Sequence, residues 1–395
     1  MNYILFEDEA RISLLPLTHT RPVAEIRVGI LRIREKWQKH LEGNFSFLTE
    51  SYLQDKYPYS PLAENIFING SVLPTSSLVK EIQSLKPGEK LVLENVVVAG
   101  RTDSDMKNIK SIDEIEFSKS KNCITEFIKI NYNWDIFTQN ELAMTADFSL
   151  LTKGRKTIGL SQTNTVITPG NVFLEEGAKV ECAILNATGG IIYIGKDAEI
   201  MEGAMIRGPF ALGDHSQVRM GAKIYGATTI GPHSKVGGEI SNSVIMGYSN
   251  KSHDGFLGNS VLGEWCNLGA DSNNSNLKNN YSKIKVWNYK EEDYINTGLQ
   301  FCGLIMGDHS KCSINTMFNT GTVVGVSANI FGNGFPPKFV PSFAWGGSEG
   351  FITYRIEDAL DVAQRVYERR KEDFNTIEKD ILRHLFEVTT KFRSW

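Results

Sequence analysis

The sequence lacks the features of a membrane protein, a secreted protein or a nucleic-acid-binding protein. No apolar run approaches the ~20 residues that a helix needs to cross a bilayer. The N-terminus turns acidic at Glu7, which is not the pattern of a secretory signal peptide. A formal net charge of −4 gives no overall attraction for nucleic acid. We therefore expect a cytoplasmic protein whose partners are small molecules, with no nucleic acid and no membrane among them.

Cysteine is also scarce, and its pattern excludes a disulfide framework. The five cysteines are odd in number and scattered, and no two of them form a CxxC pair. Disulfide scaffolds and thiolate metal sites need paired or clustered cysteines. The pattern is typical of reduced thiols in a cytosol, and it assigns no metal ligand.

A repeat of six residues dominates the middle of the chain. An α-helix repeats every 3.6 residues and a strand every 2, so a sustained period of six fits neither alone. It is typical of a parallel β-helix, in which each six residues make one short strand and one turn. The bulky aliphatic positions are Ile194, Ile200, Ile206, Leu212, Val218, Ile224, Ile230 and Val236, and the rhythm returns between residues 257 and 330.

The sequence on either side of the repeat has a different character. Residues 1 to about 150 alternate short apolar runs with helical spacing, which predicts a small Rossmann-like α/β domain with parallel strands. Residues 356–388 carry an amphipathic stripe. We expect this helical stripe to pack against the β-helix or a neighbouring subunit, without chemistry of its own. The expected strands are 3–6, 45–48, 66–68 and two runs within 91–99, and the expected helices are 30–41, 76–85 and 134–151.

Basic residues follow the first predicted strand of an otherwise acidic chain. Arg11, Arg21 and Arg27 lie in this segment, and Asn69 follows a later predicted strand. Ligands of α/β sheets bind at the carboxyl ends of strands, and clustered arginines suit phosphate groups. From charge alone, a solvated helix start is an equal alternative.

The motif PLTxxRP at residues 16–22, followed by a glycine, resembles the signature loop of sugar-1-phosphate nucleotidyltransferases. The resemblance implies that Arg11, Arg21, Arg27 and Asn69 bind nucleotide phosphates, with Mg²⁺ as cofactor if the domain is active. Two departures leave activity open. The glycine-rich phosphate loop is replaced by residues 7–10, and Ser71 stands where the family has its Mg²⁺-binding aspartate.

Residues 253–276 resemble, without a gap, the acetyltransferase segment of the bifunctional GlmU-like proteins, which are glucosamine-1-phosphate acetyltransferases and N-acetylglucosamine-1-phosphate uridylyltransferases. The resemblance implies a left-handed β-helix, acetyl-CoA as co-substrate, and a homotrimer with each acetyl-transfer site between subunits. The corresponding positions are His253 and Asn276 for catalysis, Arg219, Asn267 and Phe256 (where the family has Tyr) for the sugar substrate, and Ala270 and Ser313 for acetyl-CoA.

These residue types suit the chemistry that the resemblance implies. An amino-sugar nitrogen that attacks a thioester must lose a proton, and imidazole accepts protons near neutral pH. A backbone N–H near Ala270 suits the oxyanion that forms. His253 alone is more readily a turn histidine that points to water. Its spacing to Asn267 and Asn276 favours the catalytic interpretation.

Two further histidines share one position of the repeat. His215 and His233 are eighteen residues apart, so they should stack if three hexads form one coil. Stacked histidines can hold zinc between subunits. The turn contexts that Asp214 and Pro232 provide favour outward-facing turn residues instead.

The predicted organisation has three parts: a sugar nucleotidyltransferase-like domain (1–152), a left-handed β-helix acyltransferase domain (157–347) and a C-terminal helical segment (348–395). The first functional hypothesis is a bifunctional transferase that acetylates glucosamine 1-phosphate and joins the product to UTP, giving UDP-N-acetylglucosamine. The first alternative is an acetyltransferase whose N-terminal domain is a degenerate nucleotide-binding or regulatory module. The second alternative is a non-catalytic hexapeptide scaffold.

Overall fold

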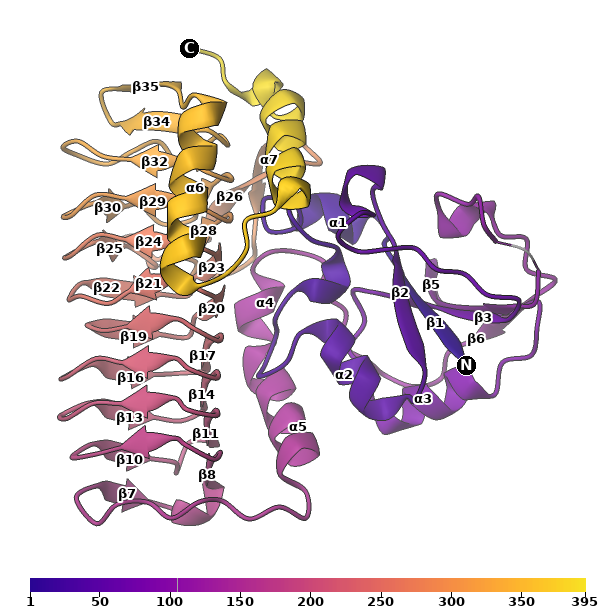
Figure 1. The fold of residues 1–395 in the computed structure, drawn as a ribbon, viewed down its shortest axis with the longest axis horizontal. Helices are drawn as coiled ribbons and strands as arrows, with labels where there is room; N and C mark the ends of the chain where they lie inside the picture. The colour runs from indigo at the N-terminus through magenta and orange to yellow at the C-terminus, as the bar shows by residue number, and fades with distance from the viewer. Residues whose placement is uncertain (105) are drawn as a thin grey trace. The chain divides into compact units, whose positions relative to one another are not determined.

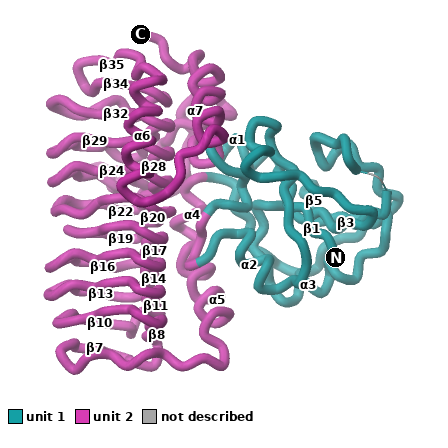
Figure 2. Tube along the Cα trace, in the orientation of Figure 1, with its two compact units in different colours: residues 1–14, 20–26, 31–132 teal, residues 15–19, 27–30, 133–395 magenta. Residues whose placement is uncertain are grey.

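The computed structural model describes residues 1–104 and 106–395 and divides into two compact units (Figures 1 and 2). Unit 1 comprises residues 1–14, 20–26 and 31–132, and unit 2 comprises residues 15–19, 27–30 and 133–395. Two short pieces of the arginine-rich segment therefore belong to unit 2. The predicted three-part division by function stays a prediction.

Unit 1 is built on a six-stranded sheet with the order β2-β1-β3-β5-β4-β6. β1 (Asn2–Phe6) pairs in parallel with β2 (Asn44–Leu48) and with β3 (Asn65–Asn69). The helices are α1 (Ala10–Ser13), α2 (Ile33–His40) and α3 (Ser76–Gln83). The predicted strands and helices of this part are thus confirmed, as is the Rossmann-like α/β class.

The expectation of parallel strands throughout this sheet is wrong at one edge. β5 (Val96–Thr102) runs antiparallel to β3, and β4 (Glu89–Leu93) runs antiparallel to β5. Only two residues separate β4 from β5, and a connection that short can join antiparallel neighbours but not parallel ones. β6 (Lys119–Asn122) completes this edge in parallel with β4. Apolar side chains from β1 and β3 pack with Ile112 and Ile115 to form a core on one face.

Unit 2 is a parallel β-helix with three main sheets as its faces. The first is β7 (Thr165–Ile167), β10 (Ile184–Asn186), β13 (Met205–Arg207), β16 (Lys223–Tyr225), β19 (Glu239–Ser241) and β22 (Phe256–Gly258). The second is β8 (Val172–Leu174), β11 (Ile192–Ile194), β14 (Phe210–Leu212), β17 (Thr228–Ile230), β20 (Val244–Gly247), β23 (Val261–Glu264), β28 (Leu304–Met306), β31 (Thr322–Val324) and β33 (Phe339–Val340). The third is β9 (Lys179–Val180), β12 (Glu199–Ile200), β15 (Gln217–Val218), β18 (Lys235–Val236), β21 (Asn250–Lys251), β24 (Asn267–Leu268), β29 (Lys311–Cys312), β32 (Asn329–Ile330), β34 (Ala344–Gly347) and β35 (Gly350–Thr353). This architecture confirms the predicted left-handed parallel β-helix.

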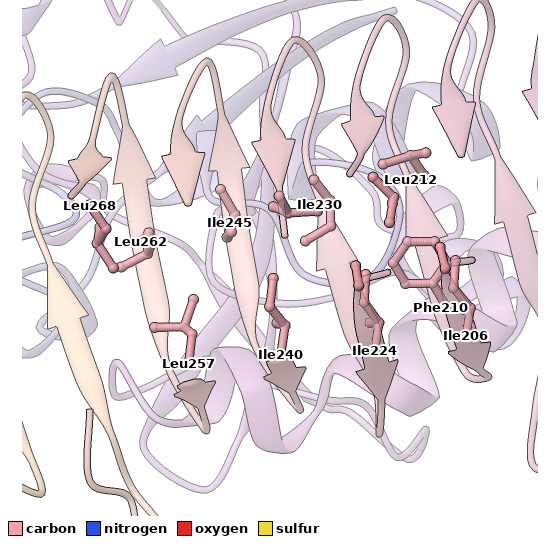
Figure 3. Packing of buried hydrophobic residues seen from close by; sticks show 14 of the residues in the cluster. Ile206, Phe210, Leu212, Ile224, Ile230, Ile240, Ile245, Leu257, Leu262 and Leu268 are labelled. Atoms are coloured by element: carbon pink, nitrogen blue, oxygen red, sulfur yellow. The ribbon is translucent and has the colours of Figure 1, made fainter. Parts of the chain in front are cut away.

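The hexad positions form the core of the β-helix. Ile194 pairs with Leu212, and Leu212 pairs with Ile230, so three hexads make one coil here. The side chains of successive coils stack in columns inside the helix, as Figure 3 shows. Burying one such side chain stabilises the fold by about 1.5–3 kcal/mol. The repeated columns therefore account for a regular helix built from strands of two to four residues.

The coils are interrupted once by a longer segment. Leu262 pairs directly with Met306, and the chain between them includes the antiparallel hairpin of β26 (Lys285–Asn288) and β27 (Asp293–Asn296). A separate short pair is formed by β25 (Asn273–Asn274) and β30 (Met317–Phe318). The longer segment is thus an inserted hairpin.

Helices lie on the β-helix at both ends of unit 2. α4 (Asp135–Thr138) and α5 (Asn140–Thr152) replace the single helix predicted over 134–151, and Met144 of α5 packs against Phe173 and Tyr193. The C-terminal stripe forms α6 (Ile356–Arg370) and α7 (Thr376–Val388), which lie along the β-helix (Figure 1). None of the helices in residues 1–104 and 106–395 combines the length and apolarity needed to cross a membrane.

Candidate active site

The predicted catalytic histidine lies at a corner of the β-helix. β21 ends at Lys251 on one face and β22 begins at Phe256 on the next, so residues 252–255 form the turn between them. His253 is exposed in this turn. Gly255 has a φ of 108°, and a Cβ added there would lie 2.2 Å from the carbonyl oxygen of Ser272. The tight approach of the next coil therefore requires glycine and fixes the path of the turn.

A pocket of about 960 Å³ opens beside this turn. Arg219, His253, Asn267 and Ala270 all line it. Arg219 directly follows β15 and Asn267 lies in β24, both on the same face as β21, in coils below and above the turn. The structure thus brings four of the predicted acetyl-transfer residues to one cavity.

The other three predicted residues lie outside the lining of this pocket. Phe256 and Asn276 lie together near β22, since a Cβ added to Gly258 would be within 2.7 Å of both side chains. The Asn276 amide donates to Asn259 Oδ1 at 2.8 Å. Ser313 precedes the pocket residue Ile314. Within one chain, the predicted site residues form two groups, one on each side of the His253 corner.

Lys251 is a residue of this region that the sequence did not single out. It pairs with Val236 and takes an inward position of the β-helix, where its side chain is 2% exposed. Its Nζ donates to the carbonyl oxygens of Gly237 (3.1 Å), His253 (2.5 Å) and Asp254 (3.2 Å). Burial lowers the pKa of Lys251 to about 8. A buried ammonium is tolerated only with such partners, and here they include two carbonyls of the His253 turn.

Basic side chains make up a second wall of the pocket. Lys235, Lys311, Arg369 and Arg370 line it together with Arg219. Burial lowers the pKa of Lys311 to about 8, and its Nζ donates to the carbonyl oxygen of His309 at 2.8 Å. The two arginines come from the last turn of α6, and no sequence pattern connects this helix with the site.

Aromatic stacking holds α6 beside the pocket. The rings of Tyr367 and Trp265 stack with centroids 3.9 Å apart, and Arg370 donates to Asn250 Oδ1 at 3.1 Å. The Tyr248 hydroxyl bonds to the Glu372 carboxylate at 3.1 Å. The predicted packing of the C-terminal stripe against the β-helix is confirmed by these contacts.

The stack continues down the same edge of the β-helix. Trp265 stacks on Tyr248, Tyr248 on His233, and His233 on His215 at 4.9 Å, so the predicted stacking of the two histidines is confirmed. All four residues have positive φ angles of 51° to 64° at the corner. Such backbone is unfavourable for bulky residues, and each aromatic contact offsets it by about 0.5–1.5 kcal/mol. Residues 1–104 and 106–395 contain no group of three or more His, Cys, Asp or Glu suited to a metal ion.

The predicted nucleotide-binding arginines are engaged in contacts within their own units. Arg11 Nε donates to Glu7 Oε2 at 3.0 Å in unit 1, and Arg27 Nε donates to the Met246 carbonyl oxygen at 3.1 Å in unit 2. Arg21 is 3% exposed. Phosphate binding by these side chains stays a prediction, and for Arg11 and Arg27 it would require an exchange of partners.

The donor set at the end of β3 fits Mg²⁺ poorly. Asn69 Nδ2 donates to Asp8 Oδ2 at 2.9 Å, and Lys129 Nζ lies 3.1 Å from the same oxygen. Ser71 donates from both its backbone nitrogen and its hydroxyl to Asn69 Oδ1. The one carboxylate in this group is already neutralised, and Mg²⁺ prefers carboxylate oxygens together with waters and substrate phosphates. We therefore assign no reaction step to a metal bound by these residues.

Sequence comparisons connect the chain with known proteins. Residues 3–156 match the model of a sugar nucleotidyl transferase family. The chain is 33% identical over 95 residues to the "Bifunctional protein GlmU" of Methanococcus aeolicus, covering 24% of this chain and 22% of that protein. It is 32% identical over 144 residues to the "Bifunctional sugar-1-phosphate nucleotidylyltransferase/acetyltransferase" of Sulfurisphaera tokodaii, covering 36% and 35%.

These matches span about a fifth to a third of the length of the curated relatives. Among solved structures, the UDP-N-acetylglucosamine acyltransferase of Arabidopsis matches with a TM-score of 0.30 and 10% identity, over 60% of this chain and 94% of that chain. The family model and the curated relatives confirm the relationship predicted from the sequence. Residues 3–156 thus match a sugar nucleotidyl transferase family, and parts of the chain are similar to bifunctional GlmU proteins.

Proposed function

We propose that the β-helix transfers the acetyl group of acetyl-CoA to the amino group of an amino-sugar 1-phosphate, with glucosamine 1-phosphate as the substrate. The observation that carries this proposal is the single pocket lined by Arg219, His253, Asn267 and Ala270. A non-catalytic scaffold would not need an exposed imidazole, a carboxamide and a guanidinium around one cavity.

In this proposal, each lining residue has one chemical task. Arg219 binds the sugar phosphate with charged hydrogen bonds. His253 accepts the proton that the amine loses as its nitrogen bonds to the thioester carbon, and it returns the proton to the departing thiolate. The backbone near Ala270 donates to the developing oxyanion. The buried Lys251 Nζ donates hydrogen bonds to the carbonyl oxygens of His253 and Asp254. These bonds fix the backbone of the turn and therefore the position of the imidazole.

The two groups of predicted residues suggest how the site is completed. His253 faces the pocket on one side of the corner, while Phe256 and Asn276 lie on the other side. We propose that a homotrimer joins the His253 group of one subunit to the Asn276 group of its neighbour. Oligomers with cyclic symmetry repeat such a composite site at every interface.

The N-terminal part is proposed to carry the second activity, uridylyl transfer from UTP to the acetylated sugar 1-phosphate. The family match over residues 3–156 supports it. The contacts of Arg11 and Arg27, and the pairing of Asp8 with Lys129, favour the alternative of a nucleotide-binding or regulatory module without transfer. Pyrophosphate release from UTP and N-acetylglucosamine 1-phosphate separates the two, since a binding module releases none.

The acetyl-transfer proposal is tested by thiol release from acetyl-CoA in the presence of glucosamine 1-phosphate. General-base assistance is typically worth about 10²–10⁴-fold, so His253→Ala should lose that much rate while binding acetyl-CoA nearly unchanged. Arg219→Ala should mainly raise the KM for the sugar phosphate. His384, on the C-terminal helix α7 and outside the pocket lining, offers a matched histidine control as His384→Ala. Equal rates for wild type and His253→Ala would overturn the assignment.

A further inference from the structure

One lysine of the pocket lining has no task in the proposed reaction. Lys311 lies in β29, is partly exposed, and lines the same cavity as His253, Asn267 and Ala270. We propose that Lys311 is a self-acetylation site, at which the lysine amine takes the acetyl group of a bound acetyl-CoA in place of the sugar amine. This inference rests on the proposed function for its donor, because it needs a thioester in this pocket.

Backbone hydrogen bonds hold Lys311 beside the segment that the proposed reaction uses. Lys311 is the register partner of Asn267 in the neighbouring coil. The backbone N–H groups of Asn267 and Gly269 donate to the carbonyl oxygens of Ser310 and Cys312, both at 3.1 Å. Paired strands lie about 4.8 Å apart, and register partners of a parallel pair project to the same side of the sheet. The Lys311 side chain therefore shares the pocket side of this face with Asn267.

The surroundings of Lys311 favour an amine that reacts. Its Nζ donates to the uncharged carbonyl oxygen of His309 at 2.8 Å, and the described residues that line the pocket include no aspartate or glutamate. Burial lowers the pKa of Lys311 to about 8, so about a tenth of the side chains are uncharged at pH 7. Only the uncharged amine has the lone pair that attacks a carbonyl carbon.

The step transfers one acetyl group and one proton. The Nζ lone pair attacks the thioester carbonyl carbon, a C–N amide bond forms and the C–S bond breaks. The amine loses one proton and the departing thiolate gains one, so the products are N-acetyl-lysine and free coenzyme A. His253 lines the same pocket and can carry the proton from nitrogen to sulfur. The new acetyl group fills space beside Asn267, so the modified chain should acetylate the sugar slowly.

Lys251 provides a contrast in the same unit. Burial lowers its pKa to about 8 as well, but it is 2% exposed and is not among the described lining residues. If a low pKa were sufficient, Lys251 and Lys311 would be equally reactive, whereas access to the pocket selects Lys311. Lys223 is the opposite control, because it is exposed to solvent and lies outside the described lining.

The first experiment maps the modification by mass spectrometry. The full chain is incubated with acetyl-CoA and no sugar, and acetylation of each lysine is followed with time. Lys311 should be acetylated at least tenfold faster than Lys223 and Lys251. Glucosamine 1-phosphate should slow this acetylation, because its amine competes for the same thioester. A rate at Lys311 no greater than at Lys223, or an equal rate at Lys251, would overturn the proposal.

The second experiment measures the consequence for activity. Preincubation of the wild type with acetyl-CoA alone should reduce its later rate of thiol release with glucosamine 1-phosphate by at least fivefold. Lys311→Arg keeps the positive charge but forms no amide under these conditions, so preincubation should leave its own starting rate unchanged. Lys223→Arg should lose activity as the wild type does. An equal loss in Lys311→Arg would contradict the proposal.

The two experiments together separate this inference from the proposed function. Acetylation of Lys311 without transfer to glucosamine 1-phosphate would support the self-acetylation site and reject the sugar as acceptor. Transfer to the sugar without acetylation of Lys311 would support the proposed function and reject the self-acetylation site. The absence of both reactions would reject both.

Discussion

Lys251 shows how one residue links the core of the β-helix to the candidate site. Its column is aliphatic in the coils below, where Ile200 pairs with Val218 and Val218 with Val236. An ammonium in this position loses its hydration, and three backbone carbonyls replace the lost water contacts. Since two of these carbonyls belong to the His253 turn, the interior of the helix is coupled to the geometry of the turn.

The depressed pKa of Lys251 predicts a pH-dependent contribution to stability. The folded state releases the proton near pH 8, whereas the ordinary value is 10.5. Between these values the unfolded chain binds more protons, so wild-type stability should rise with pH over this window by up to about 3 kcal/mol. Lys251→Met should lack this rise, while the exposed Lys223→Met should keep it.

Urea unfolding at pH 7 and pH 10 measures the effect. The free energy of unfolding of wild type, minus that of Lys251→Met, should be larger at pH 10 than at pH 7. Other titrating groups are common to both proteins and cancel in the difference. An identical difference at both pH values would mean that Lys251 keeps its ordinary pKa in the folded state.

The site residues differ in how far the sequence could identify them. His253, Asn267 and Ala270 lie in a gap-free motif, and the hexad period places Asn267 and Ala270 in the coil that follows the histidine. The sequence places Lys251 at a repeat position that is aliphatic in other coils. A polar residue at such a position usually indicates that the repeat is interrupted there. Its role depends on carbonyls of a neighbouring coil, which no local pattern specifies.

At the scale of elements, the docking of α6 determines whether the basic wall exists. Val366, Arg369 and Arg370 follow the 3–4 spacing that places side chains on one helix face. In the sequence, two arginines at the end of a helix are typical of residues that complement the helix dipole. Their second role depends on the stack of Tyr367 on Trp265, which sets the rotation of the helix on the β-helix. Helical period alone therefore predicted the helices but not their part in the pocket.

Tyr367→Ala should release the C-terminal helices from the β-helix. The side chain is 5% exposed, stacks on Trp265 and contacts the Phe374 ring at a tilted angle. Truncating a buried aromatic residue typically costs about 3–5 kcal/mol, which is enough to raise the population of undocked helices. Hydrogen exchange should become faster across residues 356–388 and stay slow in the hexad strands of the β-helix core.

A matched tyrosine tests whether docking is responsible. Tyr281 is 66% exposed, so Tyr281→Ala should change stability by no more than about 0.5 kcal/mol and leave exchange in the helices unchanged. Undiminished protection of residues 356–388 in Tyr367→Ala would show that other contacts hold the helices.

At the scale of the whole molecule, the division of the site residues into two groups predicts a composite active site. His253 and Asn276 are 23 positions apart, yet the first lines the pocket and the second lies beside β22 on the other side of the corner. Within a single chain, the corner of the β-helix separates the two side chains, so they cannot contact one substrate together. A neighbouring subunit in a closed ring could present its Asn276 group directly to the pocket.

Mixed oligomers test this arrangement. Co-expression of His253→Ala and Asn276→Ala chains, each nearly inactive alone, should restore thiol release to about a quarter of the wild-type level, because random mixing pairs an intact His253 with an intact neighbouring Asn276 at that frequency. Light scattering should give a mass near three times the 44.1 kDa of the chain. Two differently tagged His253→Ala chains serve as the control, since no mixture of them regenerates a site. Mixed oligomers that form, as shown by co-purification of both tags, but remain inactive would place every residue of the site within one chain, and the proposed role of Asn276 would then have to be abandoned.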